Sequence, residues 1–162
     1  MFRVCELASV RVAYMRRLGA YGPEISQTWE KLMQWEREKS IPLGIGVGAY
    51  WDDPQMTPVE QCRADVCLCV PENVAPDPQA GVDIQILPAG RYAIALHDFT
   101  DAEADYPKFW RELCEEVAKT PGLTPADKAT APKPCYEIYY HSPFCNSPSK
   151  RWIVDFCLAL SD

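Results

Sequence analysis

The fold is decided by two similar stretches, Val4-Cys-Glu-Leu-Ala-Ser-Val-Arg-Val-Ala13 and Ile84-Gln-Ile-Leu-Pro-Ala-Gly-Arg-Tyr-Ala93. Leucine, arginine and alanine recur in both at an offset of 80 residues. An ordered series of matches at such offsets is hard to obtain by chance, so the sequence indicates an internal duplication. Further matches follow in order at offsets of 81, 89 and 90, among them Trp29 with Trp110, Tyr50 with Tyr139, Pro54 with Pro143, Pro58 with Pro148, Asp65 with Asp155 and Cys67 with Cys157.

The duplication predicts how the chain is organised. We expect one domain made of two repeat modules, residues 1–71 and 82–162, joined by the Pro-rich linker Pro71–Gly81. Two copies are too few for a solenoid and suit a pseudo-twofold domain. The length of 162 residues fits one domain of ordinary size.

Each module shows the same order of elements: a short front strand, a strand, a helix and two strands. One helix is predicted after Gly22-Pro23 and one over 105–119, because apolar residues such as Trp29 and Trp110 recur there at helical spacing. The predicted fold class is therefore α+β, with a mostly antiparallel sheet and two main helices. Apolar and alternating runs predict the main strands over 10–16, 43–50, 63–70, 91–97, 136–140 and 152–160.

The acidic composition argues against one class of function. Lys and Arg number 16 against 23 Asp and Glu, which gives a formal net charge of −7. A surface that binds nucleic acid needs a basic face. Direct binding of nucleic acid is therefore not expected, and a cationic or neutral partner suits the chain better.

No feature of the sequence indicates a membrane or secreted protein. No apolar run approaches the roughly 20 residues needed to span a bilayer. Glu6 interrupts the region where a secretory signal needs a continuous apolar run. We therefore expect a cytoplasmic protein.

The eight cysteines are interpreted as buried free thiols, because the cytosol is reducing and several of them lie in apolar runs. Strong zinc sites use paired C-x-x-C units, which this sequence lacks, and it contains only two histidines. We therefore expect no metal and no cofactor. The cysteines are Cys5, Cys62, Cys67, Cys69, Cys114, Cys135, Cys145 and Cys157.

The run Leu43-Gly-Ile-Gly-Val-Gly-Ala-Tyr50 places three glycines on one face of a predicted strand. A bare glycine face usually means that something approaches the backbone closely. A neighbouring strand or helix could fill that space, and so could a ligand. A dinucleotide-binding fingerprint fits poorly, because the glycine spacing is wrong and no helix follows.

Glu137 corresponds to Gly48 at the offset of 89 and shares a strand face with Tyr139. A carboxylate among aromatic rings attracts a lipophilic cation, and a buried one could also act as a general acid or base. The alternative is an ordinary glutamate facing water, since Glu in strands is more often solvated.

Other residues allow two interpretations each. Trp29 and Trp110 occupy matched helical positions and line either a pocket wall or the core. Asp65 and Asp155 are interpreted as hydrogen-bonding residues at strand edges.

The ordered motifs resemble the GyrI-like small-molecule-binding family over nearly the whole chain. The resemblance rests on Pro88-Ala-Gly-Arg-Tyr-Ala, on the helix opening Gly19-Ala-Tyr-Gly-Pro with Trp29, on Cys135-Tyr-Glu-Ile-Tyr-Tyr-His-Ser-Pro and on Asp155-Phe-Cys-Leu-Ala-Leu. The family includes effector-binding domains of AraC- and MerR-type regulators and stand-alone DNA gyrase inhibitors. It implies two SHS2-type strand–helix–strand–strand modules around a central groove.

The resemblance also implies a site and a ligand class. The binding glutamate of the family carries over to Glu137, and the groove accepts hydrophobic, aromatic or cationic compounds, as in multidrug binding. The aromatic lining carries over to Tyr139, Tyr92, Trp110 and Tyr50, with Trp29 as the duplicate of Trp110.

Three functions follow from these observations. The first is a stand-alone sensor or sequestering module for a small molecule. The second is a hydrolase of cyclopropane-bearing electrophiles, in which Glu137 would be catalytic. The third is an interaction protein that modulates DNA gyrase. The sequence shows no helix-turn-helix segment, so we expect any DNA reading to come from a separate regulator.

Overall fold

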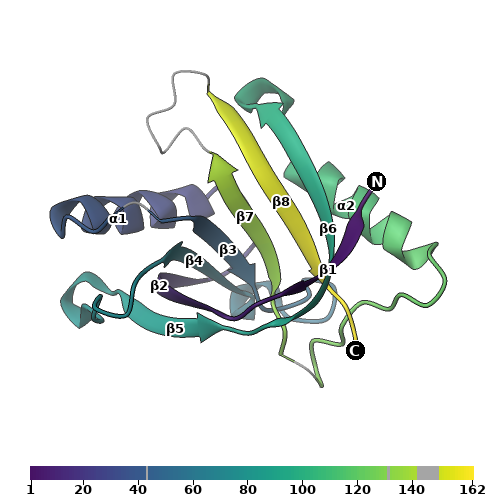
Figure 1. Cartoon of the computed structure of the whole chain (residues 1–162), viewed down its shortest axis with the longest axis horizontal. Helices are drawn as coiled ribbons and strands as arrows, with labels where there is room; N and C mark the ends of the chain where they lie inside the picture. Colours follow the sequence, from purple (N-terminus) through teal and green to yellow (C-terminus); the bar gives the residue numbers. More distant parts are fainter. Residues whose placement is uncertain (43, 131, 142–149) are drawn as a thin grey trace. The chain divides into compact units, whose positions relative to one another are not determined.

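The computed structural model describes residues 1–42, 44–130, 132–141 and 150–162, with the backbone alone at residue 141. Eight strands and two α-helices lie in this part of the chain, and six strand pairings within it are antiparallel (Figure 1). The predicted α+β class with two main helices is confirmed. The predicted strand start at Leu43, the matches at Pro143 and Pro148, and Cys145 lie outside the described residues.

The chain divides into two compact units, which we call unit 1 and unit 2. Unit 1 consists of Met1–Ala8 and Ala89–Asp162, and unit 2 consists of Ser9–Pro88. Unit 1 contains β1 (Arg3–Leu7), β6 (Gly90–Thr100), α2 (Tyr106–Ala118), β7 (Cys135–His141) and β8 (Arg151–Ala159). Unit 2 contains β2 (Val10–Leu18), α1 (Ile25–Glu38), β3 (Gly46–Tyr50), β4 (Arg63–Cys69) and β5 (Asp83–Leu87).

The front strand of each predicted repeat belongs to the unit built from the other repeat. β1 pairs with β6 in unit 1, and β5 pairs with β2 in unit 2. The two pairings have matching registers: Cys5 lies opposite Tyr92, and Gln85 lies opposite Val12. Gln85 is the residue 80 positions after Cys5, and Tyr92 is the residue 80 positions after Val12. The common element order thus extends to the pairing of single residues, while the module boundaries at 71 and 82 stay a prediction.

Helix α1 forms where the apolar stripe predicted it. Pro23 precedes its first turn, where a missing N–H is tolerated, and Trp29, Leu32 and Glu36 are buried on one face. The helix packs on β2 and β4 of unit 2. Trp35 Nε1 also donates a 3.0 Å hydrogen bond to Asp77 Oδ2, which ties the helix to the Pro-rich segment.

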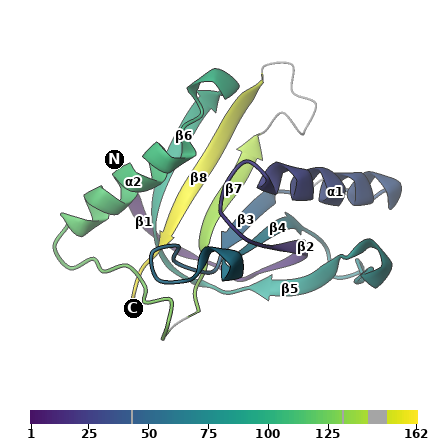
Figure 2. The ribbon, with the colours of Figure 1, turned by 180° about the vertical axis from the view of Figure 1, so that it is seen from behind.

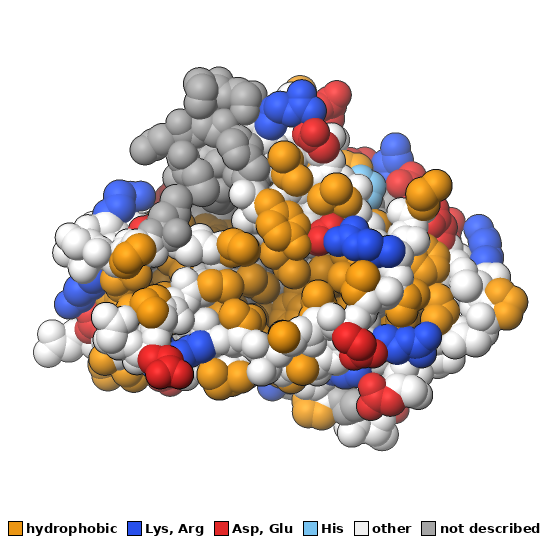
Figure 3. Space-filling view, viewed as in Figure 1, with side chains coloured by type: hydrophobic (Ala, Val, Ile, Leu, Met, Phe, Trp, Pro, Cys, Tyr) orange, Lys and Arg blue, Asp and Glu red, His pale blue; other side chains and the backbone are white. Residues whose placement is uncertain are grey.

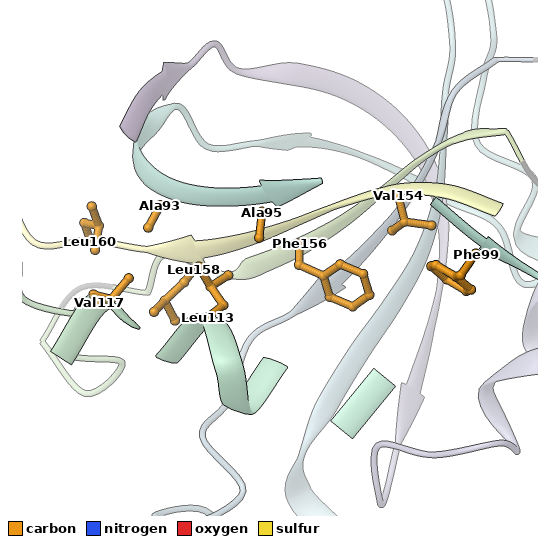
Figure 4. Close-up of a cluster of buried hydrophobic side chains, with 9 residues drawn as sticks. All are labelled: Ala93, Ala95, Phe99, Leu113, Val117, Val154, Phe156, Leu158 and Leu160. Atoms are coloured by element: carbon orange, nitrogen blue, oxygen red, sulfur yellow. The ribbon is translucent and has the colours of Figure 1, made fainter. Parts of the chain in front are cut away.

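Helix α2 covers one face of β6 and β8 in unit 1 (Figures 1 and 2). Asp105 caps its N-terminus by accepting a hydrogen bond from the Lys108 N–H, and Pro107 lies in the first turn. Between helix and strands lies a core of nine buried side chains, which Figure 4 shows: Ala93, Ala95, Phe99, Leu113, Val117, Val154, Phe156, Leu158 and Leu160.

The glycine before β3 is required by a neighbouring strand. A Cβ at Gly44 would lie 2.1 Å from the carbonyl oxygen of Cys69, at the end of β4. The Cys69 N–H also donates to the Ile45 carbonyl at 3.0 Å, so the two backbones meet side by side. Close packing of strands therefore accounts for Gly44 without a ligand.

We expect Gly44→Ala to lower the free energy of unfolding by about 1–3 kcal/mol, because the methyl group cannot fit against a backbone oxygen. Denaturant unfolding measures the change. The matched control is Gly22→Ala, where an added Cβ meets nothing within 4 Å and the loss should stay below about 0.5 kcal/mol. Equal losses in both variants would contradict this explanation of Gly44.

The seven described cysteines are free thiols but are not all buried. Cys62, Cys67 and Cys157 are buried, and burial raises the pKa of each of these thiols. Cys114 lies exposed on α2, so the interpretation of the cysteines as buried is wrong at this position. The other described cysteines, Cys5, Cys69 and Cys135, are half-buried.

We expect a thiol reagent to label Cys114 of the native protein at least about 100-fold faster than the three buried cysteines, because the thiolate is the reacting species and burial suppresses it. Mass spectrometry of digested protein measures the rate at each position. Cys114→Ser should remove the fast phase. Rapid labelling of Cys67 in the folded protein would contradict the assignment.

The surface carries both acidic and basic side chains. On the face shown in Figure 3, lysine and arginine side chains lie scattered among acidic ones and form no basic surface among the residues drawn there. No helix in the described ranges has the length and apolar character needed to cross a bilayer.

Candidate functional site

Glu137 is a buried carboxylate on the helix-covered face of unit 1. It lies in β7 opposite Phe156 of β8, a member of the core under α2. Only 3% of Glu137 is exposed, so it is not the solvated strand glutamate that was the alternative. Strand pairing therefore directs this acid toward α2.

Both carboxylate oxygens of Glu137 accept hydrogen bonds from aromatic side chains. Trp110 Nε1, from α2, donates to Oε1 at 2.8 Å. The Tyr139 hydroxyl, two residues along β7, donates to Oε2 through a short hydrogen bond. Buried carboxylates need such donors, because desolvation without them is costly. Three of the residues predicted for the site therefore lie together.

Neutral rings surround this group. Trp110 meets Phe156 edge-on with ring centroids 5.4 Å apart, and Tyr139 meets Trp152 in the same way at 6.0 Å. Burial raises the pKa of Tyr106, and the negative charge of Glu137 raises it further. This phenol therefore keeps its proton, and the site presents one acid within an aromatic surround.

Unit 2 repeats the aromatic residues without the acid. Gly48 occupies the position of Glu137, and a Cβ there would lie 3.2 Å from the Tyr50 hydroxyl oxygen and 3.3 Å from the Tyr50 ring. Tyr50 meets Tyr21 edge-on at 5.0 Å, and Trp29 is buried in α1. The predicted residues Tyr50 and Trp29 thus surround no carboxylate at the duplicated position.

Tyr92 lies on the opposite face of the unit 1 sheet from Glu137. It pairs with Ala159, whereas Glu137 pairs with Phe156, and these two β8 positions point to opposite faces. Tyr92 is fully buried, stacks on Tyr136 and donates to the Pro134 carbonyl at 3.0 Å. The structure does not bring Tyr92 into the group around Glu137.

Two further acids are buried, and neither lies at a strand edge as the sequence interpretation had it. Asp65 lies in β4 between β2 and β3, and Asp155 lies in β8 between β6 and β7. Both are inner strands, so both carboxylates depend on donors from neighbouring side chains. The described residues form no group of three or more ligands that could hold a metal ion.

Tyr106 was missed by the sequence reasoning. It is the first residue of α2 and packs on Phe156 with ring centroids 5.6 Å apart. It lies close enough to Glu137 for the carboxylate charge to raise its pKa. Its spacing of four residues from Trp110 places both on one side of the helix. This spacing is the sequence signal from which Tyr106 could have been predicted as a neighbour of Trp110.

The chain belongs to the GyrI-like family, which is described as the GyrI-like small molecule binding domain. The model of this family matches residues 1–161 of the chain. It is 32% identical over 146 residues to DNA gyrase inhibitor 2 of Dickeya dadantii (strain 3937), covering 90% of this chain and 85% of that protein. The resemblance inferred from the motifs is therefore confirmed.

Solved structures share the fold. The crystal structure of the EcmrR C-terminal domain matches all of this chain and 98% of that domain, with a TM-score of 0.71 and 14% identity. The structure of SAV2435 bound to tetraphenylphosphonium matches 99% of this chain and 94% of that one, with a TM-score of 0.65 and 12% identity.

We expect Trp110→Phe to lower the free energy of unfolding by about 1–3 kcal/mol more than Trp152→Phe. Both changes remove an indole N–H that donates to a carboxylate, but Trp110 serves buried Glu137 and Trp152 serves Asp101 at the surface. Chemical denaturation of both variants gives the comparison. Equal destabilisation of the two variants would show that the buried hydrogen bond contributes no more to the free energy of unfolding than the exposed one.

Proposed function

We propose that this protein binds a lipophilic cation through Glu137 and acts as a sensor or sequestering protein. The observation that carries the proposal is the burial of the Glu137 carboxylate between Trp110 and Tyr139 in a protein of a small-molecule-binding family. Both of these donors to the carboxylate are neutral side chains.

The chemistry of the group favours this ligand class. Trp110 and Tyr139 are neutral donors, so they orient the carboxylate without adding charge of their own. Aromatic faces add dispersion and cation–π attraction, which grow stronger where water is excluded. The net charge of −7 also draws cations toward the molecule. The tetraphenylphosphonium complex of SAV2435, which has the same fold, supports the assignment.

A hydrolase is a second candidate, favoured by the hydrogen bond between Tyr139 and Glu137. A carboxylate held by a phenol can take a proton from water as the water oxygen attacks a strained ring carbon. The ring C–C bond then breaks, its electron pair stays on the other carbon, and that carbon takes the proton back from Glu137. The phenol would keep the carboxylate oriented during that attack. Action on DNA gyrase, in the cytoplasm, is supported only by the names of relatives such as the Dickeya protein.

We expect Glu137→Gln to weaken binding of tetraphenylphosphonium at least about tenfold, because the amide keeps the shape and loses the charge. Triphenylphosphine oxide, a neutral compound with similar rings, should bind both proteins within about twofold. Titration calorimetry measures both affinities.

The control variant is Glu30→Gln, which removes a charge from the exposed side of α1 and should leave both affinities unchanged. Equal losses for cation and neutral compound in Glu137→Gln would show that Glu137 acts only through structure. Release of a ring-opened product from a cyclopropane substrate, lost in Glu137→Gln, would replace the sensor by the hydrolase.

A further inference from the structure

One carboxylate oxygen of Asp155 has no hydrogen-bond partner among the described residues. Only 2% of the residue is exposed. Arg3 Nη2 donates to Oδ2 at 2.6 Å, and the Tyr140 hydroxyl donates to the same oxygen at 2.9 Å. Oδ1 is buried and accepts no hydrogen bond from any residue that the structure describes. Such an acceptor is costly in a folded protein and calls for an explanation.

Asp65, at the matching position of the other repeat, shows which hydrogen bonds a buried aspartate can make in this fold. It is the duplicate of Asp155 and is equally buried. Arg16 donates to both of its oxygens, through Nε to Oδ1 at 2.8 Å and through Nη2 to Oδ2 at 2.9 Å. Trp51 Nε1 and Gln85 Nε2 each add a 2.8 Å hydrogen bond to Oδ2. A complete set of donors is therefore possible in this fold.

The register shows which donors Asp155 lacks. Arg16 lies directly opposite Asp65, and the residue directly opposite Asp155 is Leu96. Gln85 of β5 is likewise replaced by Cys5 of β1, and a thiol is a weak donor. The group missing at Oδ1 is thus the N–H of a guanidinium.

Asp155 is separated from solvent by side chains that reach the surface. Arg3, Leu96 and Tyr140 are each about half exposed. Burial raises the pKa of Tyr140 to about 12, and its hydrogen bond to Asp155 contributes, so the phenol remains a donor. Arg3 holds the carboxylate through a single nitrogen, and its half-exposed side chain can turn aside to admit a ligand.

We infer that Asp155 is a second binding site, which takes a small amidinium or guanidinium cation with an apolar body. The N–H groups of the ligand supply Oδ1 with the donors that Arg16 supplies to Asp65. Its apolar body lies over Leu96 and Tyr140. Charge-assisted N–H bonds to a carboxylate are strong and directional, which favours planar cations of this type.

This site differs from the one at Glu137 in position and in requirement. Asp155 pairs with Leu96 and Ile138, so it lies on the sheet face opposite Glu137. Asp155 needs an N–H donor at Oδ1, whereas each carboxylate oxygen of Glu137 already accepts a hydrogen bond. A quaternary phosphonium has no N–H and cannot satisfy Oδ1.

The test uses benzamidine, its neutral amide analogue benzamide, and tetraphenylphosphonium, each titrated into the whole protein by calorimetry. The informative variant is Leu96→Arg, which places a guanidinium opposite Asp155 as in the other repeat and leaves Asp155 intact. Leu96→Met is the matched control, because it replaces the same half-exposed side chain without a donor. Glu137→Gln separates the two sites.

We expect saturable binding of benzamidine and at least tenfold weaker binding of benzamide. Leu96→Arg should weaken benzamidine at least tenfold and raise the Tm by about 2–4 °C, while Leu96→Met leaves benzamidine within twofold. With Glu137→Gln in the background, Leu96→Arg should still weaken benzamidine at least tenfold. Tetraphenylphosphonium should bind Leu96→Arg as it binds the parent protein.

Three results would overturn the inference. Absence of saturable benzamidine binding would mean that a water molecule suffices at Oδ1. Loss of benzamidine binding in Glu137→Gln, with Leu96→Arg unaffected, would place the cation at Glu137. Equal loss in Leu96→Arg and Leu96→Met would show that the side-chain change alone disturbs the face.

Discussion

A carboxylate can be buried only where donors surround it, and this requirement shapes both units. Glu137 takes a donor from helix α2, Asp65 takes one from β5, and Asp155 takes one from β1. In each case the donor comes from a segment distant along the chain. Apolar packing alone would leave these segments free to slide, whereas a directed hydrogen bond holds each in register.

The sequence predicted the elements well because their periods are local properties. The spacing of apolar residues predicted α1 and α2, and the two-residue period placed Glu137 and Tyr139 on one face. The duplication supplied Trp110 by its match to Trp29. These inferences needed no knowledge of how strands pair.

The face of Tyr92 could not be predicted in the same way. Whether a residue of β6 shares a face with a residue of β7 depends on the register of both with β8, and a shift of one residue exchanges the faces. The burial of Glu137 and the set of donors around Asp155 also depend on side chains that strand pairing brings close. The sequence therefore predicted an acidic group among aromatic side chains, but only some of the residues that surround it.

The crossed pairing of the front strands limits how the two repeats can exist apart. A fragment that ends in the linker Pro71–Gly81 retains β2 but loses β5, its neighbour in the sheet. The remaining fragment retains β6 but loses β1. Each half alone exposes an open strand edge, which favours association with another chain.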